Sequence, residues 1–180
     1  MFVTAGDDKS ARIWDARTGA PKGEPFMHDD GVTDAVFSRD GKYIATGSKD
    51  RTARFWEVAT GKQMTEPMQH VRAVNSVDLS PDGAYLIAAC DDSTVRVWRT
   101  ATGQSGAEPL QHDGAVWSAR FSPDGRMVVS YGKEKLARVW ETASWKLVTE
   151  PLAHTAQINS AVFSKDGAFV ATASTDKTAR

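Results

Sequence analysis

The sequence lacks the features of several common classes of protein. Cys90 is the only cysteine among 180 residues, which excludes an internal disulfide and a metal cage built from cysteines. Lys and Arg number 22 and Asp and Glu number 23, so no basic field is present to hold nucleic acid. No apolar run approaches the roughly 18 residues of a membrane span, and residues 1–10 lack a secretory signal. These absences predict a soluble, cytoplasmic protein with no cofactor, no metal, and no nucleic-acid or membrane partner.

What the chain does contain is a repeat of 42 residues without insertion or deletion. Independent landmarks keep this register through the whole chain, and self-similarity of this kind indicates stacked structural units. The landmarks include Trp14, Trp56, Trp98 and Trp140; His28, His70, His112 and His154; and the Asp-Gly pairs that begin at Asp40, Asp82, Asp124 and Asp166.

Each repeat carries the signals of short strands and tight turns. Segments such as VTDAVFS, KYIATGS and TARFWE are rich in β-branched and aromatic residues. Turns such as Ser80-Pro81-Asp82-Gly83 separate them, and a more polar segment follows. The pattern predicts four antiparallel strands per repeat and no helix.

Both faces of the predicted strands are apolar, since Phe55 and Trp56 point to opposite sides of one strand. A single small sheet cannot bury two apolar faces, so the sheets must stack on one another. Radial stacking of four-stranded sheets gives an all-β fold, the β-propeller. We expect one domain over residues 1–180, with a partial blade at 1–27, full repeats at 28–69, 70–111 and 112–153, and a partial blade at 154–180.

The combination of His, Ser-Pro-Asp-Gly, and an Asp six residues before the Trp of Arg-x-Trp resembles the WD-repeat family over the whole chain. The resemblance implies a structural hydrogen-bond network in each blade. Carried over, its members are His28, Ser48, Asp50 and Trp56; His70, Asp92 and Trp98; His112 and Trp140; and His154, Ser174 and Asp176. Cys90 replaces the serine of the second set, and Gly132 and Glu134 depart from the pattern in the third. We therefore expect blades of unequal rigidity.

The chain begins and ends within predicted strands, which favours a piece of a longer propeller. One alternative is a closed four-blade ring, in which the N-terminal strands borrow the strand near residues 158–163. Another is a larger ring that two chains build together. Open sheet edges would also promote self-association.

The histidines and the turn acids recur once per blade, so they are expected to be structural rather than catalytic. Cys90 has no nearby base to activate it. The sequence therefore predicts no catalytic residue.

Partners of WD-repeat proteins often dock at three positions per blade on one face, and the resemblance carries these positions to this chain. The candidates among these positions are Trp117, Thr33, Lys49, Asn75, Asp91, Lys133, Gln157 and Asn159. Trp117 is the strongest candidate, because it is a large aromatic residue where its counterparts are small and polar. Trp145 also lies outside the regular tryptophan series. It replaces a turn glycine, so we expect that turn to change shape.

The resemblance implies a non-catalytic scaffold for other proteins or peptides. One alternative is the sensing or targeting module of a larger regulatory enzyme, and another is a catalytic propeller. Fold alone does not separate these functions.

Overall fold

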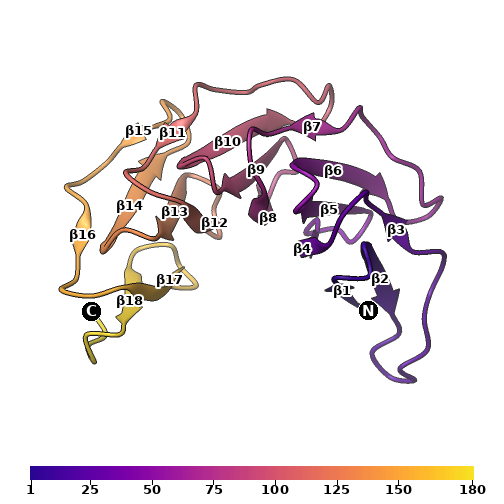
Figure 1. The fold of residues 1–180 in the computed structure, drawn as a ribbon, viewed down its shortest axis with the longest axis horizontal. Coiled ribbons are helices and arrows are strands. Elements are labelled where there is room, and N and C mark those ends of the chain that lie inside the picture. Colours follow the sequence, from indigo (N-terminus) through magenta and orange to yellow (C-terminus); the bar gives the residue numbers. More distant parts are fainter.

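A computed structural model describes residues 1–180 and contains strands and turns without a helix (Figure 1). No element could serve as a membrane-spanning helix. The strands are β1 (Phe2–Ala5), β2 (Ser10–Trp14), β3 (Phe26–Met27), β4 (Val32–Phe37), β5 (Tyr43–Ser48), β6 (Thr52–Glu57), β7 (Met68–Gln69), β8 (Val74–Leu79), β9 (Tyr85–Cys90), β10 (Thr94–Arg99), β11 (Leu110–Gln111), β12 (Val116–Phe121), β13 (Met127–Gly132), β14 (Leu136–Glu141), β15 (Lys146–Leu147), β16 (Leu152–Ala153), β17 (Ile158–Phe163) and β18 (Val170–Ser174).

The strands form five antiparallel sheets in chain order. Three strands, β1–β2–β3, make the first sheet, and β4–β5–β6–β7 and β8–β9–β10–β11 make the next two. The fourth sheet runs β12–β13–β14–β15, with β16 also paired to β14, and β17–β18 make the last. The prediction of an all-β fold with four-stranded antiparallel sheets is confirmed.

Tight turns set the register of the inner strands. Between β4 and β5, the Ser38 hydroxyl donates to Asp40 (2.6 Å), and Gly41 takes a left-handed φ of 71° that a side chain would disfavour. The same turn recurs at Gly83, Gly125 and Gly167. Because successive strands are antiparallel, the turns from β4 to β5 and from β6 to β7 lie on one face of the molecule, and the β5–β6 turns lie on the opposite face.

The core lies between neighbouring sheets. One cluster joins Phe55 and Met68 of the second sheet to Val74 and Val77 of the third. Another joins Val95 and Val97 to Val116, Phe121 and Trp140 across the next junction. Each sheet thus buries an apolar face against the following one, as the two-sided apolar pattern predicts.

Side chains also connect the innermost strands of successive sheets. Asp34 on β4 accepts the backbone N–H of Val77 (3.1 Å) and pairs with Arg120 on β12 (3.0 Å). Asp78 on β8 accepts the N–H of Phe121 (2.8 Å), and burial raises the pKa of its carboxyl. These bonds fix the sheets relative to one another.

The stack forms an open arc with the two termini at its two ends (Figure 1). The alternative in which the N-terminal strands borrow the strand at 158–163 was wrong, because β17 pairs with β18 alone. No closed ring is present in the single chain.

Candidate functional site

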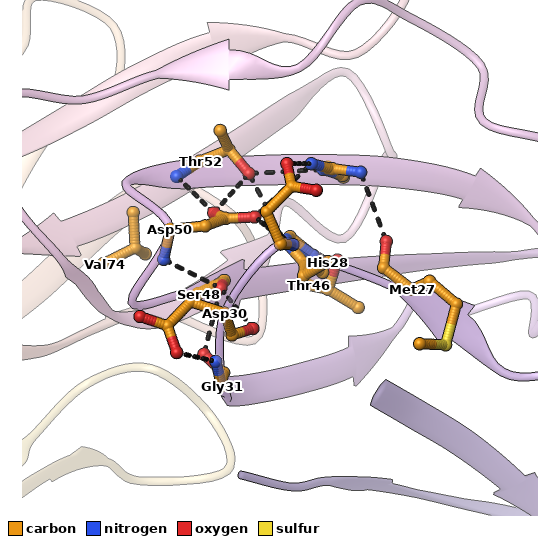
Figure 2. A network of polar contacts seen from close by, with 12 residues as sticks. Met27, His28, Asp30, Gly31, Thr46, Ser48, Asp50, Thr52 and Val74 are labelled. Carbon is orange, nitrogen blue, oxygen red and sulfur yellow. Dashed lines mark hydrogen bonds and ion pairs between the residues drawn. The ribbon is translucent and has the colours of Figure 1, made fainter. Parts of the chain in front are cut away.

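A buried polar network ties the second sheet together (Figure 2). His28 lies between β3 and β4, and its Nε2 contacts the hydroxyl of Thr46 on β5 at 2.7 Å. Trp56 on β6 donates its indole N–H to the same hydroxyl (2.8 Å). The other ring nitrogen of His28 contacts Asp50 Oδ2 at 2.8 Å. The network therefore connects two strands, a turn and the loop that enters the sheet.

Ser48, which the sequence assigned to this network, contacts Asp50 but neither His28 nor Trp56. Ser48 donates instead to the carbonyls of Asp30 (3.0 Å) and Gly31 (2.9 Å), and accepts the N–H of Asp50 (3.0 Å), as Figure 2 shows. Likewise Thr172, and not Ser174, contacts His154 (2.8 Å). Residues two apart on a strand share a face, so spacing alone did not distinguish the two hydroxyls.

Burial and hydrogen bonding set the charges in this network. Burial lowers the pKa of His28 despite the neighbouring Asp50 carboxylate. Burial alone would raise the pKa of Asp50, but hydrogen bonds from Thr52, the Asp29 amide and His28 outweigh it and lower this pKa. Arg54 pairs with Asp50 at 3.3 Å. The network thus holds a neutral imidazole beside an ionised carboxylate.

The fourth sheet carries a complete network, which corrects the expectation that Gly132 and Glu134 would weaken it. Ser130 contacts His112 (2.8 Å) and accepts the N–H of Trp140 (2.8 Å). Glu134 contacts His112 and pairs with Arg138 (2.9 Å). The longer Glu side chain therefore fills the role of Asp50. Gly132 fits because a Cβ there would collide with the backbone of Ala115.

Among the three central sheets, the third is the one with an incomplete network. Ala88 occupies the register position of Thr46, so Trp98 donates directly to Nε2 of His70 at 3.3 Å. Nδ1 of His70, Oδ2 of Asp92 and Nε of Arg96 are buried without hydrogen-bond partners. Burial, reinforced by Arg96, lowers the pKa of His70 to about 4. The network of the third sheet is therefore incomplete because of Ala88, and not because of Cys90 as the sequence indicated.

His70, Cys90 and Asp92 are the residues best placed to hold a metal ion, since their donor atoms lie within 4.8 Å of one another. The hydrogen bonds oppose this use. Because Trp98 donates to Nε2 of His70, the ring proton lies on Nδ1, so neither ring nitrogen has a free lone pair for an ion. Burial also raises the pKa of the Cys90 thiol to about 11. Binding an ion would require both groups to lose a proton.

The predicted partner-binding residues lie on the face of the β5–β6 turns, and several already make bonds there. Thr33, in a β-bulge at the start of β4, donates to the carbonyl of Val74 in the next sheet (2.6 Å). Asn75, in the equivalent bulge of β8, donates to the carbonyl of Val116 (2.8 Å) and to Asp91 (2.7 Å). Lys49 pairs with Asp7 of the preceding sheet at 2.7 Å.

Trp117 occupies the same bulge position at the start of β12 but makes no bond to the next sheet. There the connection comes from Tyr131, whose hydroxyl donates to the carbonyl of Asn159 (3.1 Å). Trp117 is half-buried, and Lys133 lies beside it on the same face, with its N–H bonded to the carbonyl of Ala115 (2.8 Å). On the last sheet, the carbonyl of Gln157 accepts the Thr175 N–H (2.9 Å).

Trp145 lies on the opposite face, and the expectation that its turn changes shape was wrong. Its φ of 55° stays in the left-handed region that Gly61 also occupies (68°). Its N–H bonds to the carbonyl of Glu141 (2.7 Å), as that of Gly61 does to Glu57 (2.9 Å). The indole packs edge to face on Tyr85, at 5.6 Å between ring centroids, which offsets the cost of this backbone conformation.

Four segments match the sequence model of the WD domain, G-beta repeat: residues 21–57, 61–99, 106–141 and 145–180. Because these matches cover most of the chain, the protein belongs to the WD-repeat family, which confirms the resemblance. Domains of this family commonly act as interaction scaffolds. No curated protein matches the chain.

Proposed function

We propose that the chain is a non-catalytic scaffold that binds another protein or peptide through Trp117 and its neighbours on the face of the β5–β6 turns. The contacting set would include Lys133 on the same sheet, with Gln157 and Asn159 on the next. The repeat units at 28–69, 70–111 and 112–153 would act as one supporting body.

This proposal rests on which residue bonds to the next sheet: in the fourth sheet it is Tyr131 and not Trp117, the bulge residue. In two sheets the bulge residue, Thr33 or Asn75, is used to hold the next sheet. In the fourth sheet Tyr131 makes the connection to the next sheet. Position 117 is thereby released from a structural bond and carries a large aromatic side chain, the type most often found at the centre of binding sites.

We call the proposed mechanism rigid display: the folded sheets hold the binding side chains in fixed positions before the partner binds. Trp117 lies on a sheet with a complete network, in which Glu134 and Arg138 pair at 2.9 Å. A partner that docks on such a surface orders few new groups, so less binding free energy is lost to entropy.

We propose no catalytic role because the histidines are engaged in hydrogen bonds within their sheets and the thiol is protonated. His28, His112 and His154 each contact a hydroxyl and a carboxylate of their own sheet. The thiol of Cys90, with its raised pKa, is a poor nucleophile. A net charge of −1 gives no support to a polyphosphate or nucleic-acid partner.

A photo-crosslinking residue at position 117 tests the proposal, with one at the exposed position Val148 as the control. We expect position 117 to capture a discrete protein that position 148 does not. With that protein purified, Trp117→Ala should weaken binding at least tenfold while the unfolding midpoint stays unchanged, and Val148→Ala should bind normally. Equal capture at both positions, or equal affinity of both variants, would contradict the proposal.

A further inference from the structure

Neighbouring sheets meet in a groove on the face of the β4–β5 and β6–β7 turns, and this groove recurs with the 42-residue period. The groove between the second and third sheets has a volume of about 680 Å³ and is lined by Asp40, Tyr43, Phe55, Met64, Leu79 and Thr100, among others; we call it the open groove. The groove between the third and fourth sheets is lined at matching positions by Asp82, Tyr85, Phe121 and Thr142. Its volume is only about 180 Å³; we call it the filled groove.

Trp145 accounts for the difference between the two grooves. Its indole lies edge to face against Tyr85 (5.6 Å) and Phe121 (6.5 Å), the residues that match Tyr43 and Leu79 of the open groove. The apolar cluster of this junction also includes Ala107. The molecule thus shows, in its own structure, that a groove of this shape accepts an indole presented from a tight turn.

At the open groove, the position equivalent to Trp145 is Gly103, which lies one repeat earlier in the sequence. The two residues have similar left-handed backbones, with φ of 69° and 55°. Because Gly103 has no side chain, it does not cover Tyr43, which is half-buried, or Met64, which is 44% exposed; Phe55 lies buried behind them. The groove between the first two sheets is less suited, since Met1 and Lys22 take the positions of Tyr43 and Met64.

We propose that the open groove binds a tryptophan side chain that a partner protein presents on a tight turn. The lining adds Arg39, Asp40 and Asp82, a net charge of −1, so a basic residue next to the tryptophan fits best. Trp145 is itself followed by Lys146. This proposal deepens the scaffold function but uses the face opposite Trp117.

A capped peptide with the sequence of residues 142–147, Thr-Ala-Ser-Trp-Lys-Leu, is the probe, and the same peptide with glycine for tryptophan is its control. Added to the ¹⁵N-labelled full chain, the first peptide should shift the amide signals of Tyr43, Phe55 and Met64 in a saturable way. The glycine peptide should bind at least tenfold more weakly. Equal binding of the two peptides, or shifts confined to other regions, would overturn the proposal.

Two variants block the groove by different means. Gly103→Trp with Thr65→Ala copies the filled groove, where Ala107 stands at the position of Thr65. The second change removes Oγ1 and Cγ2 of Thr65, which would lie 3.2 and 3.4 Å from a Cβ on Gly103. Met64→Lys places in the groove a residue that the chain already carries at position 22. Each variant should reduce peptide binding at least tenfold, and undiminished binding by a folded variant would contradict the assignment.

Two further variants separate this site from its alternatives. Trp145→Gly should empty the filled groove and raise the number of bound peptides from one to two per chain. Trp117→Ala should leave peptide binding unchanged, so this proposal and the proposed function can fail independently. If the free chain dimerises in analytical ultracentrifugation and Met64→Lys makes it monomeric, a second copy occupies the groove and the partner proposal is wrong.

Discussion

Trp98 donates its indole N–H directly to His70 across 3.3 Å, whereas Trp56 and Trp140 donate to a hydroxyl that lies between them and their histidines. The cause is a single residue, Ala88, in the position of Thr46 and Ser130. Its consequence is three buried polar atoms without partners in one sheet. Burying such atoms without a hydrogen bond costs free energy, so we expect the third sheet to be the least stable of the three central sheets.

Restoring the hydroxyl should therefore stabilise the protein. Ala88→Ser adds one oxygen at the position where Ser130 bonds to both His112 and Trp140. We expect the free energy of unfolding to rise by about 1 kcal/mol, measured by urea denaturation. The matched control is Ser130→Ala, which should lower it by roughly 1–3 kcal/mol because it leaves two buried groups unpaired. A destabilised Ala88→Ser protein would show that the site has no room for a hydroxyl.

The two turn carboxylates, Asp50 and Asp92, should contribute different amounts to the free energy of unfolding. Asp50 accepts hydrogen bonds from the Thr52 hydroxyl (2.7 Å) and the Asp29 amide (3.0 Å), and contacts His28. Asp92 accepts from Thr94 on one oxygen, and its other oxygen accepts no hydrogen bond and only pairs with Arg96 at 3.8 Å. Asp50→Ala should cost about 1–2 kcal/mol more than Asp92→Ala in the same urea experiment. Equal costs would mean that the network bonds contribute nothing beyond the turn itself.

Stability should fall as the pH is lowered from about 6.5 towards 4. His70 has a folded-state pKa of about 4 against an ordinary value of 6.5, so in this window the unfolded chain binds a proton that the folded chain does not. The contribution is fully present above pH 6.5 and is lost as the pH falls through the folded-state pKa. It amounts to roughly 3 kcal/mol.

Urea denaturation at several pH values between 7.5 and 4.5 measures this effect. His70→Gln removes the titrating group, and its stability should depend less steeply on pH than that of the parent chain. The slope should not vanish, because the pKa values of His28 and His112 are also lowered by burial. If stability depends equally steeply on pH in both proteins, a group other than His70 is responsible for the pH dependence.

Removing the indole that fills the groove beside Tyr85 should destabilise the fourth sheet. Trp145→Gly relieves a left-handed backbone (φ 55°) but loses the packing on Tyr85 and Phe121. We expect a net loss of about 2 kcal/mol. Thermal unfolding followed by circular dichroism would detect it, with the exposed Val148→Ala variant as a control that should not change. A stabilised Trp145→Gly protein would show that backbone strain outweighs the packing.

The sequence predicted the sheets and their stacking because each local signal recurs several times in register. The strands β5, β9 and β13 all follow a Ser-x-Asp-Gly turn, and all place apolar residues on both faces. Such repetition removes the ambiguity that a single short apolar segment would leave.

The sequence did not show which hydroxyl joins each network or how the unusual side chains are used. Thr46 and Ser48 lie on the same face of β5, and only the position of the Trp56 indole selects between them. The bond from Tyr131 to the carbonyl of Asn159 depends on the distance between two sheets, which no spacing within a repeat encodes. The left-handed φ of Trp145 is sustained by packing against another sheet, so its turn could not be predicted locally.

Binding by rigid display requires that the face that carries Trp117 be rigid, and amide hydrogen exchange of the isolated chain measures this directly. We expect the amides of β12 and β13 around Trp117 to exchange slowly, at a level set by global unfolding. The amides of β9, which contains Ala88, and of its neighbour β10 should exchange faster through local opening. Fast exchange throughout β12 and β13 would contradict rigid display, because the binding surface would then have to be ordered by its partner.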